Sequence, residues 1–130
     1  MAPGMASHYL SCHAQVVAVI RLSYAGRVEY FAVTTVHGSN WDGSKSIREQ
    51  QAWAEHASFM DGLVADGLIV LGGPLDDGEH VLLIIEAADE GEVRQRLASD
   101  PWNPMDMLSV GSVKRWSIWL DGRIEGPIRQ

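Results

Sequence analysis

The sequence has one cysteine, few basic residues and no long apolar run, and each shortage excludes a class of protein. Among 130 residues Cys12 is the single cysteine, so an internal disulfide and a site of several thiolates are excluded. The 10 Lys and Arg residues against 17 Asp and Glu give a formal net charge of −7, which disfavours binding to a polyphosphate backbone. No stretch reaches the roughly 18 apolar residues of a membrane span, and the first residues lack a signal-peptide pattern. We therefore expect a cytoplasmic protein that binds neither nucleic acid nor a membrane.

Short catalytic motifs are also missing. The chain contains no GxGxxG after a strand, no GxxxxGK[ST], no HExxH and no GxSxG, which carry dinucleotide, nucleotide-phosphate, zinc-protease and esterase chemistry. Four of its histidines lie in three different segments without the spacing of metal ligands: His8, His13, His37 and His80. We expect neither a metal site nor a bound cofactor.

What is present fits one globular domain, with 46% hydrophobic and 21% charged residues. Residues 1–26 are expected to form an N-terminal extension with at most one extra edge strand, at 16–20. Residues 27–122 form the predicted domain, and 123–130 a C-terminal tail. The predicted strands of that domain span 28–36, 68–71, 80–87 and 108–120. The second and third should pair as a hairpin through a turn at 72–78. One predicted helix spans 46–65, where Ser46 and Glu49 have capping-box spacing and Gly67 suits a left-handed helix end. The other starts at Asp89, with Glu92 three residues on, and stops before Asp100-Pro101.

This order of strand, helix, two strands, helix and strand predicts an α+β domain of the ferredoxin-like type, with both helices on one face of an antiparallel sheet. On the last predicted strand, alternation places Trp116, Ile118 and Leu120 on one side and Ser117 and Trp119 on the other. Apolar side chains on both sides predict that the uncovered face meets a second copy of the chain.

His56 lies at the centre of the apolar stripe of the first predicted helix. Its neighbours on that stripe are Ala52, Trp53, Phe59, Met60, Leu63 and Val64. One interpretation is a core histidine whose ring is hydrogen-bonded internally. The other is a general acid or base, since histidine titrates near neutral pH.

Asp100 is the carboxylate that we consider as a partner for His56, although an aspartate before proline also suits a simple turn. The glycines at 72 and 73 before Pro74 either shape a hairpin or permit close approach of a ligand. Trp41, in a polar loop, either covers its own core or contacts a ligand.

Taken together, these residues resemble the YCII domain family, the YciI-like proteins. The resemblance covers about residues 29–120 and rests on His56, Phe59, Met60, Leu63, Gly67, Ile69, Gly73-Pro74, Val81 to Glu86, Glu92-Val93, Leu97 and Asp100-Pro101-Trp102. It implies a ferredoxin-like domain that pairs into a dimeric α+β barrel, with His56 and Asp100 as the family's recurring pair. One branch is similar to a dehydrochlorinase of a chlorinated hydroxyquinol, and the wider superfamily includes muconolactone isomerases and metal-free monooxygenases.

We therefore expect a small cofactor-independent enzyme, of the lyase or isomerase type, in which His56 and Asp100 move a proton on an aromatic or lactone-like substrate. The expected pocket is walled by Met60, Gly73, Pro74 and Trp102. Two alternatives stay open: a non-catalytic module that binds a small ligand or a protein partner, and a structural domain with a core histidine.

Overall fold

The structure is a computed structural model that describes residues 28–123. Its strands are β1 (Glu29–His37), β2 (Ile69–Pro74), β3 (His80–Ala87) and β4 (Leu108–Trp116). Its helices are the short 3-10 helix η1 (Ile47–Glu49) and the α-helices α2 (Trp53–Ala65) and α3 (Glu90–Leu97). The extra edge strand expected within the N-terminal extension lies outside the described residues. No helix in the described part of the chain is long and apolar enough to cross a membrane.

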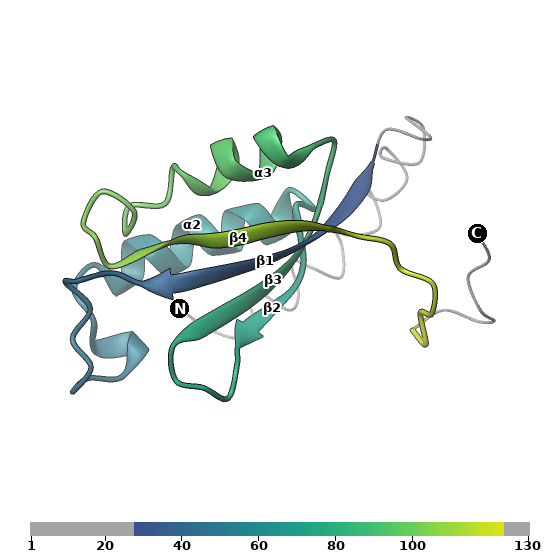
Figure 1. Cartoon of the computed structure of the whole chain (residues 1–130). Coiled ribbons are helices and arrows are strands. Elements are labelled where there is room, and N and C mark those ends of the chain that lie inside the picture. Colours follow the sequence, from purple (N-terminus) through teal and green to yellow (C-terminus); the bar gives the residue numbers. More distant parts are fainter. Residues whose placement is uncertain (1–27, 124–130) are drawn as a thin grey trace.

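The four strands form one antiparallel sheet in the order β2-β3-β1-β4. Both α-helices lie on the same side of this sheet (Figure 1). The α+β class, the antiparallel sheet and the pairing of the second and third strands are confirmed, and the arrangement is consistent with a ferredoxin-like fold.

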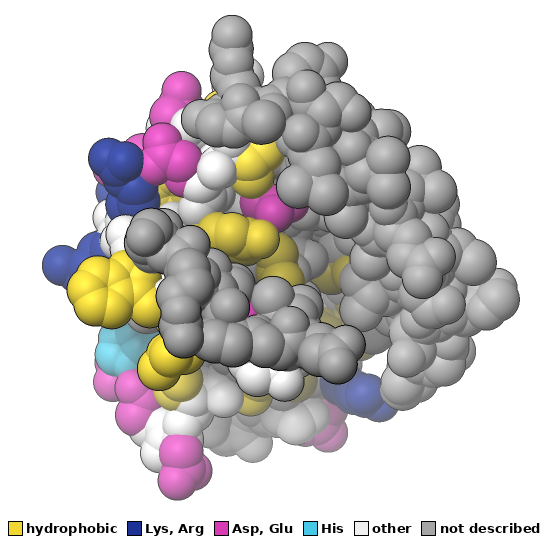
Figure 2. Space-filling model, turned by 90° about the vertical axis from the view of Figure 1, so that its right-hand side faces the viewer, with side chains coloured by type: hydrophobic (Ala, Val, Ile, Leu, Met, Phe, Trp, Pro, Cys, Tyr) yellow, Lys and Arg dark blue, Asp and Glu magenta, His cyan; other side chains and the backbone are white. Residues whose placement is uncertain are grey.

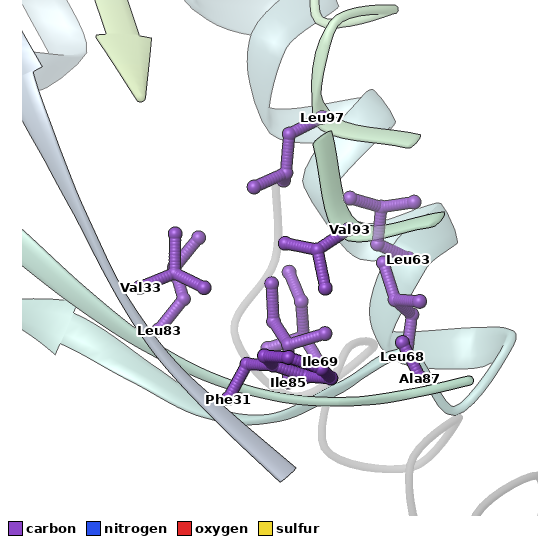
Figure 3. Packing of buried hydrophobic residues seen from close by; sticks show 10 residues of the cluster. All are labelled: Phe31, Val33, Leu63, Leu68, Ile69, Leu83, Ile85, Ala87, Val93 and Leu97. Carbon is purple, nitrogen blue, oxygen red and sulfur yellow. The ribbon is translucent and has the colours of Figure 1, made fainter. Parts of the chain in front are cut away.

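The core lies between the helices and the covered face of the sheet. Figure 3 shows strand side chains such as Phe31 and Val33 pointing toward Val93 and Leu97 of α3. Phe31 of β1 lies opposite Ile85 of β3, and directly opposed residues share one face of the sheet. Because side chains alternate along a strand, Phe31 and Val33 both point into this core. Leu63 of α2 belongs to the same cluster, so its packing on the covered face of the sheet fixes the position of this helix.

The predicted starting residue of the first helix is wrong. The expected helix over 46–65 is divided into η1 and α2, because Ala52 adopts a left-handed backbone with φ of 60°. Just before this break, the buried Gln50 side chain makes two hydrogen bonds to the backbone of Asp42. Its amide N–H donates to the Asp42 carbonyl at 2.7 Å, and its amide oxygen accepts the Asp42 N–H at 3.0 Å. Glu49 does accept from the Ser46 N–H at 2.9 Å, but on the short helix. These loop contacts compete with helix continuation.

Two strand predictions also need correction. Residues 72–74 belong to β2 and are not a turn, because they pair with β3; Pro74 is tolerated there since β2 is an edge strand. β4 ends at Trp116 instead of residue 120, because Trp116 pairs with Tyr30 and the described β1 begins one residue before Tyr30.

Residues 117–120 therefore lie outside β4, and the predicted alternation of side chains between two sheet faces does not apply to them. Three large apolar side chains of residues 116–120 are nevertheless exposed, with Trp116 at 44%, Trp119 at 67% and Leu120 at 82%. Figure 2 views the end of the molecule toward which β4 runs and shows hydrophobic side chains there among charged ones.

Candidate active site

His56 is held one turn inside α2 with its side chain buried. The residue is 6% exposed, and its N–H donates to the Ala52 carbonyl at 3.1 Å. The left-handed Ala52 thus sets where the helix begins, and with it the direction in which the imidazole points. Farther along, Gly67, with φ of 82°, ends the helix as the sequence predicted.

Asp100 follows the end of α3 and meets His56 across 44 residues of sequence. Its two carboxylate oxygens lie 2.8 and 3.0 Å from the His56 Nδ1. One of them also accepts the backbone N–H of Trp102 at 2.9 Å. The expected proximity of the two side chains is confirmed, and the turn-forming alternative for Asp100 holds as well, because the same carboxylate organises the Asp-Pro-Trp turn.

Trp102 fixes the plane of the His56 ring. The two rings are stacked, with centroids 3.8 Å apart and planes 9° from parallel. Trp102 is fully buried, and its indole N–H donates to the Gln51 carbonyl at 2.6 Å. The imidazole is therefore held by a carboxylate at its edge and by an indole on its face, so few orientations remain open to it.

This geometry specifies a tautomer of the neutral ring. A carboxylate accepts hydrogen bonds, so Nδ1 carries the proton that points to Asp100 and Nε2 keeps its lone pair. No residue between 28 and 123 hydrogen-bonds to Nε2. A histidine with one nitrogen anchored and the other unengaged has the form that a general base requires.

A cavity of about 520 Å³ lies beside this pair. The six residues predicted from the sequence all line it: His56, Asp100, Met60, Gly73, Pro74 and Trp102. Its size falls within the range of small-molecule sites, about 300–1,000 Å³. The structure thus brings the predicted site residues together around one cavity.

Aromatic rings continue along the cavity wall. His37 stacks on Trp41 with centroids 3.7 Å apart, and Trp41 meets the Trp102 ring edge to face at 5.6 Å. Trp53, at the start of α2, lies 5.9 Å from the His56 ring. Trp41 packs on its own domain, as one interpretation of this residue predicted. It also lines the cavity, and contact with a ligand stays a prediction.

Sequence reasoning did not assign His37, Thr35 or Trp53 to the site. Trp53 was detectable, because it lies three residues before His56 on the same helix. Partial burial lowers the pKa of His37 below its ordinary value, while the nearby carboxylates of Glu79 and Asp77 oppose that shift. His37 is therefore neutral at pH 7, so this histidine adds no positive charge to the lining of the cavity.

Within residues 28–123, no group of three His, Cys, Asp or Glu side chains is arranged to hold a metal ion. Comparison of the whole chain with protein-family models, with curated proteins and with solved structures finds no match. The resemblance to the YCII domain family therefore stays a prediction from the sequence.

Proposed function

We propose that the cavity is the active site of a cofactor-independent lyase or isomerase in which His56, oriented by Asp100, transfers a proton on a compact aromatic or lactone-like substrate. The observation that supports this most directly is the His56–Asp100 pair at 2.8 Å, whose unengaged Nε2 belongs to a residue lining the cavity. A structural core histidine would need no open cavity beside it.

In the proposed reaction, Nε2 removes a proton from a carbon next to a carbonyl group. The electron pair left on the substrate either expels a leaving group such as chloride, which is an elimination, or is reprotonated at another carbon, which is an isomerisation. Asp100 holds the ring in position and stabilises the imidazolium that forms. The apolar and aromatic wall, with Trp41, Trp53 and Met60, favours a flat substrate.

Solvent-proton exchange tests the proposal without requiring the natural substrate. Muconolactone and a chlorinated hydroxyquinol are incubated in D₂O, and deuterium uptake or chloride release is followed by NMR and ion analysis. We expect the wild type to catalyse one of these reactions and His56→Gln to lose about 10²–10⁴-fold of the rate.

His80→Gln is the matched control. His80 also bonds an aspartate, Asp77, but it lies at the start of β3 and does not line the cavity. Equal losses in both variants, or full activity in His56→Gln, would refute the proposed role. Binding of both compounds without any exchange or elimination would favour the non-catalytic binding module.

We also propose that the sheet face away from the helices pairs with a second copy of the chain into a dimeric barrel. A row across that face joins Leu71, Ile84, Ala32 and Lys114, and Leu71 is 54% exposed. A large exposed apolar side chain on a sheet face favours association. Light scattering should give twice the chain mass for the wild type and the chain mass for Leu71→Arg; a wild-type monomer would contradict this proposal.

A further inference from the structure

Thr35 carries a hydroxyl that the fold does not use. Its Oγ1 is the only buried side-chain polar atom within the described residues that has no hydrogen-bond partner. The residue is 5% exposed and lines the cavity that also holds His56. Buried hydroxyls are almost always paired, since leaving one unpaired costs free energy.

The neighbours of Thr35 explain why its hydroxyl lacks a partner. Paired residues of the four strands form one row across the floor of the cavity: Pro74, Val81, Thr35 and Val110. Thr35 is the only residue of this row with a polar side-chain atom. The register shift between Thr34 and Thr35 places Val110 opposite Thr35, so an apolar side chain flanks the hydroxyl on each side.

Packing does not account for threonine at this position. Valine has nearly the same shape and the same preference for strands, and it would leave no unpaired hydroxyl on the floor. Alternate residues of β1 on this face are Phe31 and Val33, which follow the apolar pattern that Thr35 breaks. The hydroxyl therefore suits a partner that occupies the cavity.

We propose that Thr35 is a substrate-positioning residue, whose hydroxyl hydrogen-bonds an oxygen atom of an aromatic ligand lying between the sheet and His56. This inference rests on the proposed use of the cavity as a small-molecule site and deepens it, because it specifies an oxygen-bearing ligand. The wall of Trp41, Trp53 and Trp102 receives the ring, and Thr35 receives the oxygen.

Phenol and toluene are the probes, because they share a ring and differ in the oxygen. Their affinities are measured by NMR titration on the full chain for the wild type, Thr35→Val and Thr35→Ser. We expect Thr35→Val to bind phenol about three- to tenfold more weakly, to bind toluene as the wild type does, and to melt at the same or a higher temperature. Thr35→Ser should keep the phenol affinity within about twofold, since it keeps the hydroxyl.

Thr34→Val is the matched control and should change neither affinity. Thr34 is the next residue, with its side chain on the opposite face of the sheet, where its hydroxyl lies 2.7 Å from that of Ser112. Equal phenol affinity in the wild type and Thr35→Val, or no phenol binding to the wild type, would overturn the inference. A clearly lower melting temperature for Thr35→Val would also overturn it, because the hydroxyl would then stabilise the ligand-free fold.

The two proposals fail separately. If phenol still shifts the His56 ring signals and binds Thr35→Val as well as the wild type, the positioning role is refuted while the proton-transfer role stands. If His56→Gln keeps its exchange activity while Thr35→Val loses phenol affinity, the reverse holds.

Discussion

Replacing Asp100 by asparagine should invert the tautomer of the His56 ring while nearly preserving its surroundings. In the wild type, one carboxylate oxygen accepts the Trp102 N–H at 2.9 Å and the other lies 2.8 Å from the His56 Nδ1. Asparagine has a single oxygen, and the backbone donor of Trp102 takes it. The amide NH₂ then faces Nδ1, which must accept, so the ring proton moves to Nε2.

The size of the effect follows from what is lost. A general base whose Nε2 is protonated cannot take a proton, and the same exchange in the serine-protease triad lowers kcat about 10⁴-fold. The fold loses less, because neutral hydrogen bonds of similar geometry replace charge-assisted ones. We expect a decrease of about 1–2 kcal/mol in the free energy of unfolding.

The assay is ¹⁵N NMR of the histidine ring, which distinguishes a protonated from an unprotonated ring nitrogen and requires no substrate. Urea unfolding gives the stability of the same samples. Asp76→Asn, an exposed substitution in the β2–β3 turn, is the matched control and should change neither measurement. A His56 ring that keeps its proton on Nδ1 in Asp100→Asn would refute the reasoning.

Two further predictions concern the fold around the site. Gly38→Ala should cost about 2–3 kcal/mol or more in urea unfolding, because the new Cβ would clash with the Asp106 backbone carbonyl. Gly43→Ala, with nothing within 4 Å of its Cβ, should be nearly neutral; equal stabilities would contradict this. The hydrogen bond to Asp77 raises the pKa of His80 above its ordinary value, and backbone and side-chain donors lower that of Asp77 to about 2. The His80 contribution to stability is therefore complete below pH 6.5 and lost as pH rises through the raised pKa, while that of Asp77 is complete above its unfolded value and lost as pH falls toward 2. NMR titration of Asp77→Asn should return the His80 pKa toward 6.5, and an unchanged value would count against the pairing.

Local sequence rules predicted those elements whose signals lie within a few residues. The spacing of Asp89 and Glu92 predicted the start of α3, and the Asp89 side chain does accept the Glu92 N–H at 2.8 Å. Gly67 predicted the end of α2 for the same local reason. The predicted start of α2 was wrong because the buried Gln50 side chain hydrogen-bonds the Asp42 carbonyl in the preceding loop. No short-range sequence pattern reveals that contact.

For the candidate site, too, local patterns predicted some features, and others depended on tertiary packing. Helical periodicity alone placed His56 at the centre of an apolar stripe, since that depends only on the 3.6-residue repeat. The resemblance to a family suggested Asp100 as its partner, but contact across 44 residues depends on how α3 and its following turn dock on α2. Strand alternation could place Thr35 on a face without showing whether its neighbours would satisfy it.

The sequence by itself determined the order of the elements and the apolar surroundings of the histidine, because both follow from side-chain periodicity along a continuous segment. Only the tertiary structure decided that His56, Asp100 and Trp102 form one hydrogen-bonded and stacked unit beside a cavity. The same holds for the unpaired hydroxyl of Thr35 on the floor of that cavity. The physical reason is that hydrogen bonds and ring stacking require alignment to a fraction of an ångström between distant segments, and sheet register and helix docking set that alignment.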